Sequence, residues 1–149
     1  MTTDNTDVIY ACLIDLKEVL QSIALLDNKT LLVYSAEELM DKASLVPLPA
    51  AGAVYEGMRA TGEVNKTTNR TGTSAEAVFT ILVLADKLKL STEGTKQANI
   101  HVMGLIRKAL RMRKSPTGHV YRFMLEAPAD EKGDTLIWAQ RWAVPVSVI

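Results

Sequence analysis

The segment "EAVFTILVLAD", residues 76–86, constrains the fold more than any other part of the chain. Its apolar side chains are nearly continuous from Ala77 to Ala85, whereas a strand with one face in solvent alternates apolar and polar residues. We therefore predict a strand over Ala75–Lys87 that is covered on both faces. One cover can be helices of the same chain, and the other can be a neighbouring subunit.

Two stretches have the spacing of amphipathic helices. The first covers residues 6–24, where one stripe comprises Ile9, Cys12, Leu13, Leu16, Val19, Leu20 and Ile23. The second covers residues 92–114, where one apolar row comprises Ala98, Val102, Leu105, Ala109 and Met112. The "SPTG" sequence at 115–118 is expected to stop this second helix.

The remaining pattern favours strands. "TLLVYS" at 30–35 predicts a short strand, and Ser35 and Glu38 have the spacing of a capping box for a short helix. A proline-led strand is expected over Ala50–Ala60. The last third alternates like a hairpin, with arms over His119–Pro128 and Thr135–Ile149, where Pro145 should require a bend or an edge position.

These elements predict a single α+β domain over residues 1–149. We expect an antiparallel or mixed β-sheet with the two long helices packed on one face and a C-terminal β-hairpin. Between two of the strands lies the polar segment "TGEVNKTTNRTGTS", residues 61–74, in which Val64 is the only sizeable apolar side chain. We expect this segment to be a flexible loop.

Charge is balanced overall but uneven along the chain. Residues 1–75 carry 6 basic and 10 acidic residues, a net of −4, and residues 76–149 carry 11 basic and 7 acidic, a net of +4. This asymmetry suits head-to-tail contact between identical subunits, or a basic face for a polyanion.

The basic residues concentrate at the expected end of the second helix, which holds Arg107, Lys108, Arg111, Arg113 and Lys114. Such cations can complement the helix dipole. They can also contact DNA phosphates or an acidic patch on a partner. With a pI of about 6.7, sequence-specific DNA binding is not expected.

No catalytic or ligand-binding motif stands out. His101 and His119 lack the spacing of metal ligands, Cys12 lies on an apolar stripe, and no phosphate-binding loop occurs. We therefore expect a protein that is not an enzyme and has no cofactor or metal. The single cysteine fits a reducing compartment, and no apolar run approaches the ~18 residues that a membrane span needs.

The order of elements resembles a known family. An amphipathic helix ("DVIYACLIDLKEVL") precedes a proline-led strand ("LPAAGAVYEG"), a polar loop and an apolar strand ("AEAVFTILVLAD"). A helix ("STEGTKQANIHVMGLIRKAL") and a hairpin ("HVYRFMLEAP" to "TLIWAQRWAVPVSVI") complete the chain. This layout is similar to that of the tail terminator proteins of long-tailed bacteriophages, the lambda protein U-like family.

The resemblance implies a structural virion protein near the neck of the tail, assembled in the host bacterial cytoplasm. Members form a hexameric ring that caps the tail tube, stops its polymerisation and gives the head a joining surface. The implied partners are further copies of the chain, the tail tube protein, the sheath, the head–neck connectors, and genomic DNA only in passage. The loop residues Lys66, Asn69 and Arg70 would then contact a neighbouring subunit or the tube. Another head–tail joining protein and a DNA-binding accessory protein are the alternatives.

Overall fold

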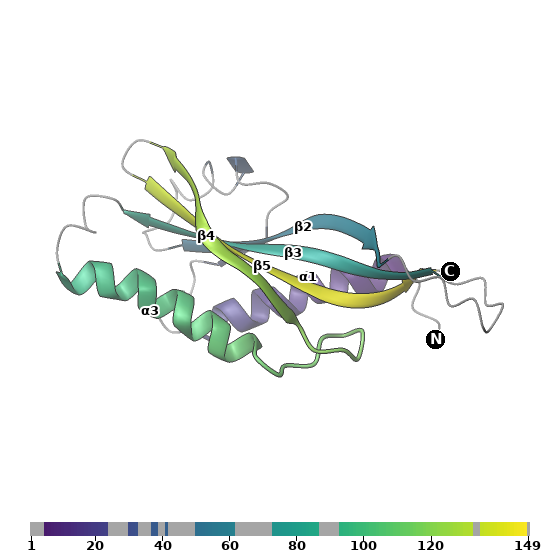
Figure 1. The fold of residues 1–149 in the computed structure, drawn as a ribbon. Helices are drawn as coiled ribbons and strands as arrows, with labels where there is room; N and C mark the ends of the chain where they lie inside the picture. The colour runs from purple at the N-terminus through teal and green to yellow at the C-terminus, as the bar shows by residue number, and fades with distance from the viewer. Residues whose placement is uncertain are drawn as a thin grey trace.

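The chain forms a mixed α+β structure, seen in a computed structural model that describes residues 5–23, 30–32, 37–38, 41, 50–61, 73–86, 93–132 and 135–148 (Figure 1). The two long helices are α1 (Asn5–Gln21) and α3 (Glu93–Leu110). The strands are β1 (Thr30–Leu32), β2 (Ala50–Ala60), β3 (Thr73–Asp86), β4 (Arg122–Lys132) and β5 (Thr135–Val148). Residues 37, 38 and 41 are helical, and the rest of the expected short helix lies outside the described residues.

All the named strands belong to one sheet, in the order β1-β2-β3-β5-β4. The neighbours β2–β3, β3–β5 and β5–β4 are antiparallel, whereas β1 runs parallel to β2. The sheet is therefore mixed, with β3 in the middle and β4 at one edge. The strand predicted over Ala50–Ala60 has those bounds in the structure.

Strand β3 is buried on both faces, as its apolar run predicted. On one side Ala77, Phe79, Ile81 and Val83 belong to the main hydrophobic core. On the other side Thr80, Leu82 and Leu84 are buried as well. The strand begins at Thr73, two residues earlier than expected, because Ala75, Ser74 and Thr73 continue the pairing with β5.

The main core also contains side chains from both helices and from β5. Helix α1 contributes Cys12, Leu16 and Leu20, α3 contributes Val102 and Ile106, and β5 contributes Trp142 and Val144. The residues named from each helix are four apart in sequence, so they lie on one face of that helix. Burial of this shared cluster provides the main driving force that brings these helices and strands together.

Helix α3 ends at Leu110, four residues before the predicted end at Lys114. Met112 has a positive φ of 63°, a left-handed conformation that no helix interior tolerates. The chain then folds into a small turn: Gly118 N–H donates to the carbonyl of Ser115, and Ser115 N–H donates to His119. Pro116 therefore occupies the second position of a β-turn, which its fixed φ favours.

Strand β4 also differs from its predicted bounds, whereas β5 (Thr135–Val148) begins at the predicted residue. Strand β4 covers Arg122–Lys132 instead of His119–Pro128, because residues 114 and 120 pair within the small turn and the later residues continue to pair with β5. The register of β4 shifts between Phe123 and Leu125 and again between Pro128 and Asp130. Pro145 lies within β5, beyond Ala143, where the β4 pairing ends.

The segment between β2 and β3 is shorter than the predicted loop 61–74. Thr73 and Ser74 belong to β3, and Thr61 donates from both its backbone N–H and its hydroxyl to the carbonyl of Ser74, at 3.1 and 3.2 Å. The two ends of the connection are thus tied together. Lys66, Asn69 and Arg70, the predicted contact residues, lie outside the described residues.

Candidate functional site

A groove runs between the C-terminal end of α3 and the edge strand β4. Its volume is about 510 Å³, and we call it the α3–β4 groove. It is lined by Arg107, Lys108, Arg111, Met112, Val120, Tyr121, Phe123 and Trp142. Helix α3, the turn that follows it and the last two strands all contribute, so the groove exists only in the folded chain.

Apolar side chains around the groove are unusually exposed. The exposed fraction is 78 % for Met112, 44 % for Phe123 and 42 % for Val120. The Phe123 ring packs edge-to-face on the buried ring of Trp142, with centroids 5.3 Å apart. The groove therefore has an aromatic base that is anchored in the core, and an apolar rim that solvent reaches.

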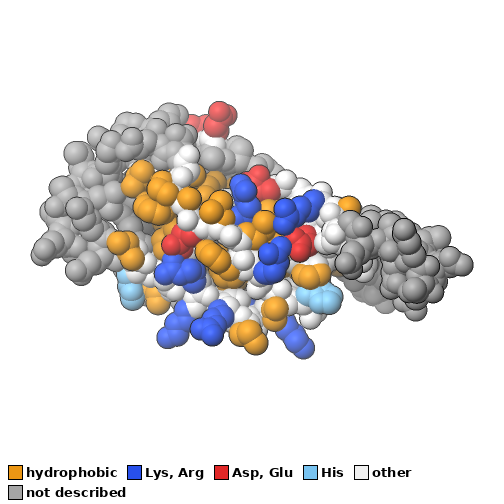
Figure 2. Space-filling view, viewed as in Figure 1, with side chains coloured by type: hydrophobic (Ala, Val, Ile, Leu, Met, Phe, Trp, Pro, Cys, Tyr) orange, Lys and Arg blue, Asp and Glu red, His pale blue; other side chains and the backbone are white. Residues whose placement is uncertain are grey.

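Cations surround this apolar rim. Figure 2 shows Lys and Arg side chains interspersed with hydrophobic ones over the lower part of the visible face. Among the described residues, neither Lys108 nor Arg111 forms a salt bridge. Both charges are therefore available to a partner.

The groove rests on a polar network that joins the sheet to α3. The Gln140 amide donates to the carbonyl of Met103 at 2.8 Å and to a carboxylate oxygen of Glu126 at 2.7 Å. It accepts from the Trp142 indole N–H at 3.2 Å, and Arg107 forms an ion pair with Glu126. Gln140 is fully buried, so this network sets the distance between α3 and the β4–β5 edge.

The turn after α3 is held in place by α1. Arg113 donates two hydrogen bonds to the Asp15 carboxylate, at 2.7 and 3.2 Å, and the Tyr121 hydroxyl donates to the same carboxylate at 2.8 Å. Burial and the adjacent Asp15 charge raise the pKa of Tyr121 well above its ordinary value. Tyr121 therefore remains a neutral donor, and the turn is fixed beside the groove.

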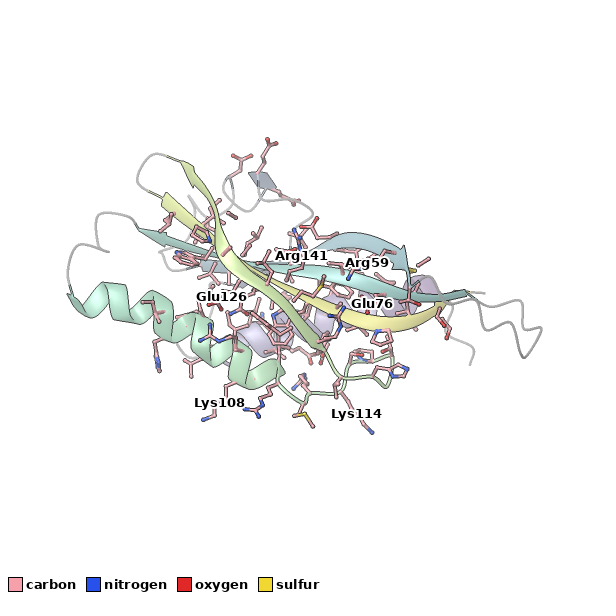
Figure 3. The ribbon with its side chains drawn as sticks, viewed as in Figure 1. Arg59, Glu76, Lys108, Lys114, Glu126 and Arg141 are labelled. Carbon is pink, nitrogen blue, oxygen red and sulfur yellow. The ribbon has the colours of Figure 1, made fainter. Side chains whose placement is uncertain are left out.

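The five predicted cations thus take different roles. Arg107 pairs with Glu126 and Arg113 with Asp15. Lys108 and Arg111 line the groove, while Lys114 is exposed outside it. Figure 3 shows Lys108 and Lys114 pointing away from the sheet, with Glu126 nearer to it. The prediction that all five lie on the end of one helix was wrong, because only Arg107 and Lys108 belong to α3.

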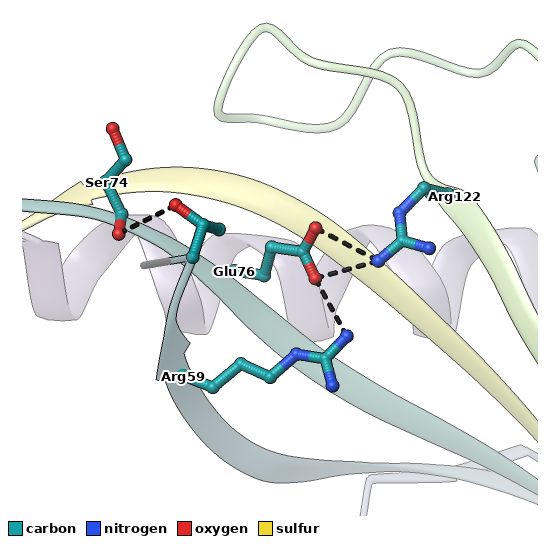
Figure 4. Close-up of polar contacts among 5 residues, drawn as sticks. Arg59, Ser74, Glu76 and Arg122 are labelled. Atoms are coloured by element: carbon teal, nitrogen blue, oxygen red, sulfur yellow. Dashed lines mark hydrogen bonds and ion pairs between the residues drawn. The ribbon is translucent and has the colours of Figure 1, made fainter. Parts of the chain in front are cut away.

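A second polar cluster connects three strands on the other side of the sheet. Glu76 of β3 accepts from Arg59 of β2 at 3.2 Å and from Arg122 of β4 at 2.8 and 3.0 Å (Figure 4). Burial acts to raise the pKa of Glu76, but the hydrogen bonds and charges of the two arginines outweigh it and hold the pKa below its ordinary value. The cluster pins the start of β4 to the centre of the sheet.

Within the described part of the chain, no group of three or more His, Cys, Asp or Glu side chains is placed to hold a metal ion. Cys12 is buried in the core, and burial together with the Asp15 charge raises the pKa of its thiol to about 11. Neither described helix has the length and apolar content that crossing a bilayer requires.

The apolar half of the groove was missed at the sequence level. Tyr121, Phe123 and Leu125 alternate in sequence as though they shared one face. Phe123 pairs with Trp142 and Leu125 with Arg141, and these adjacent β5 residues lie on opposite faces. Met124 is the extra residue of this bulge. Nothing in the sequence around it predicts that the strand changes face there.

Comparison of the sequence with models of known protein families and with curated proteins finds no match.

Proposed function

We propose that this protein is a structural virion component, a tail terminator-like subunit that forms a ring on the end of a phage tail tube. The ring would stop tube polymerisation and provide the surface to which the head joins. In this proposal both long helices pack on one face of the sheet and β4–β5 form the C-terminal hairpin of the family. The sequence resemblance in element order is the reason for choosing this family.

The observation that carries the proposal is the α3–β4 groove. A chain with zero net charge exposes Met112, Val120 and Phe123 beside two cations that form no ion pair among the described residues. Monomeric soluble proteins rarely expose large apolar patches, which more often mark interaction sites. Interface cores typically combine aromatic residues, Met and Arg in this way. A surface of this kind supports a role in assembly.

The proposal is tested by the mass of the protein in solution and by negative-stain microscopy, alone and with tail tube protein. We expect a ring that binds the tube end and blocks further addition of tube subunits. A protein that stays monomeric in the presence of tube would contradict it. A ring that joins heads but leaves tube growth unaffected would favour the alternative of another head–tail joining protein.

A DNA-binding accessory role is the second candidate, and it rests on Lys108, Arg111 and Lys114. Because Glu126 and Asp15 neutralise Arg107 and Arg113, three of these five cations have no ion pair among the described residues and remain for phosphate contact. Each phosphate contact steepens the fall of log affinity with log salt concentration by about one unit of slope. This candidate therefore predicts weak DNA affinity that falls steeply with salt and is lost when the three residues are changed to Ala.

A further inference from the structure

We infer that the α3–β4 groove receives a second copy of this chain in a head-to-tail contact, through a different and acidic surface of that copy. The inference rests on the proposed ring and names the surface that would build it. It is argued from the charge, exposure and support of the groove residues.

The charge of the groove disfavours self-pairing. In a two-fold dimer the same patch meets itself, which brings Lys108 and Arg111 of both copies into one interface. Like charges placed next to each other in an interface cost several kcal/mol. We therefore place a different surface in the groove, which makes the contact heterologous.

The first half of the chain carries charge opposite in sign to that of the groove. Residues 1–75 have a net charge of −4, and the groove belongs to residues 76–149, which carry +4. Exposed carboxylates in the first half include Glu18 on α1, Glu56 on β2, and Glu37. Repeated contact between unlike surfaces closes into a ring when the rotation allows.

The apolar rim adds the part of the contact that excludes water. Phe123 rests on Trp142, and Trp142 donates to the buried Gln140, so this side chain is held ready before any partner arrives. Met112 adds a flexible thioether that can adapt to an irregular surface. A preorganised aromatic residue beside an adaptable Met is well suited to form the centre of an interface.

The experiment compares matched variants of the full chain by native mass spectrometry and by sedimentation over a concentration series. Lys108→Glu tests the charged rim, and Lys114→Glu is its control, an exposed lysine outside the groove. Phe123→Ser tests the apolar rim, and Ile100→Ser is its control, a side chain that is 68 % exposed on α3.

We expect each groove variant to raise the concentration for half-assembly by about tenfold or more, and each control to change it little. Added salt should weaken wild-type assembly and reduce the difference between Lys108→Glu and wild type. Circular dichroism establishes that the variants are folded. Lys108 is exposed and forms no ion pair among the described residues, so Lys108→Glu should fold. It therefore tests the groove assignment even if Phe123→Ser unfolds.

The outcomes separate the two proposals. If wild type forms rings and the groove variants form them equally well, the groove assignment is wrong and the proposed function stands. If wild type never assembles, alone or with tail tube protein, both the proposed function and the groove assignment are wrong. Rings that persist in Lys108→Glu while DNA affinity disappears would assign the groove to nucleic acid and also overturn the inference.

Discussion

Replacement of Gln140 by Leu should destabilise the protein although it makes the core more apolar. Leu is close to Gln in volume, so little cavity is created. Among the described residues the buried Trp142 indole N–H loses the one acceptor it has, and Glu126 loses one donor. An unsatisfied buried donor costs about 1–3 kcal/mol, so we expect the free energy of unfolding to fall by about 2 kcal/mol. For ~150 residues this lowers Tm by about 4–8 °C.

Replacement of Gln140 by Ala should lower the free energy of unfolding further than replacement by Leu. It removes the same hydrogen bonds and also leaves space among fully buried neighbours, which costs on the order of 1–2 kcal/mol more. The expected stability order is therefore wild type, Gln140→Leu, then Gln140→Ala. Urea unfolding followed by circular dichroism and tryptophan fluorescence measures all three. Gln21→Leu, at the exposed end of α1, is the control and should stay within about 0.5 kcal/mol of wild type.

A double variant identifies the cause. Trp142→Phe removes the indole N–H, so Gln140→Leu should cost less in the Trp142→Phe background than in wild type. The two losses should then fall short of additivity by about 0.5–3 kcal/mol, as for residues in contact. If Gln140→Leu is as stable as Gln21→Leu, the buried hydrogen bonds of Gln140 do not stabilise the protein as described. If the two losses simply add, the Trp142–Gln140 hydrogen bond does not couple these side chains.

Other predictions concern the Tyr121–Asp15 hydrogen bond, the Cys12 thiol and Met112 in the turn after α3. Tyr121→Phe removes the hydrogen bond to Asp15 and should lower the free energy of unfolding by about 1–2 kcal/mol, measured in urea. Because the folded Cys12 thiol has its pKa raised from 9.0 to about 11, stability should fall as pH rises between these values. Cys12→Ala should flatten that fall in urea titrations at the two pH values, and an unchanged slope would contradict it. Met112→Gly removes about 1–2 kcal/mol of left-handed strain but adds chain entropy, so Tm should change little while assembly weakens.

The sequence predicted the parts of the fold that depend on local periodicity. The apolar run from Ala77 to Ala85 predicted a strand buried on both faces, and the apolar stripes predicted α1 and most of α3. The end of α3 was misplaced because its position depends on Asp15, which captures Arg113 and Tyr121 across 98 and 106 residues. No local pattern reports a contact of that separation.

The candidate site was predictable only by its charges. Lys108 and Arg111 stood out as part of a basic cluster, and both line the groove. The sequence did not predict the change of face after Phe123, because the bulge between Phe123 and Leu125 has no local sequence signal. The left-handed conformation of Met112 was equally hidden, since Gly is the usual residue in that position.

The two bulges of β4 and its Pro128 bear on how copies of the chain can approach one another. An edge strand with evenly spaced free amides is a template on which another strand can pair, and repeated pairing of that kind leads to fibres. Pro128 has no amide hydrogen to offer, and the register shifts on either side of it break the spacing of the others. Growth of one continuous sheet from copy to copy is therefore disfavoured at this edge. Copies that meet beside it do so through side chains, and such an assembly can stop at a fixed size.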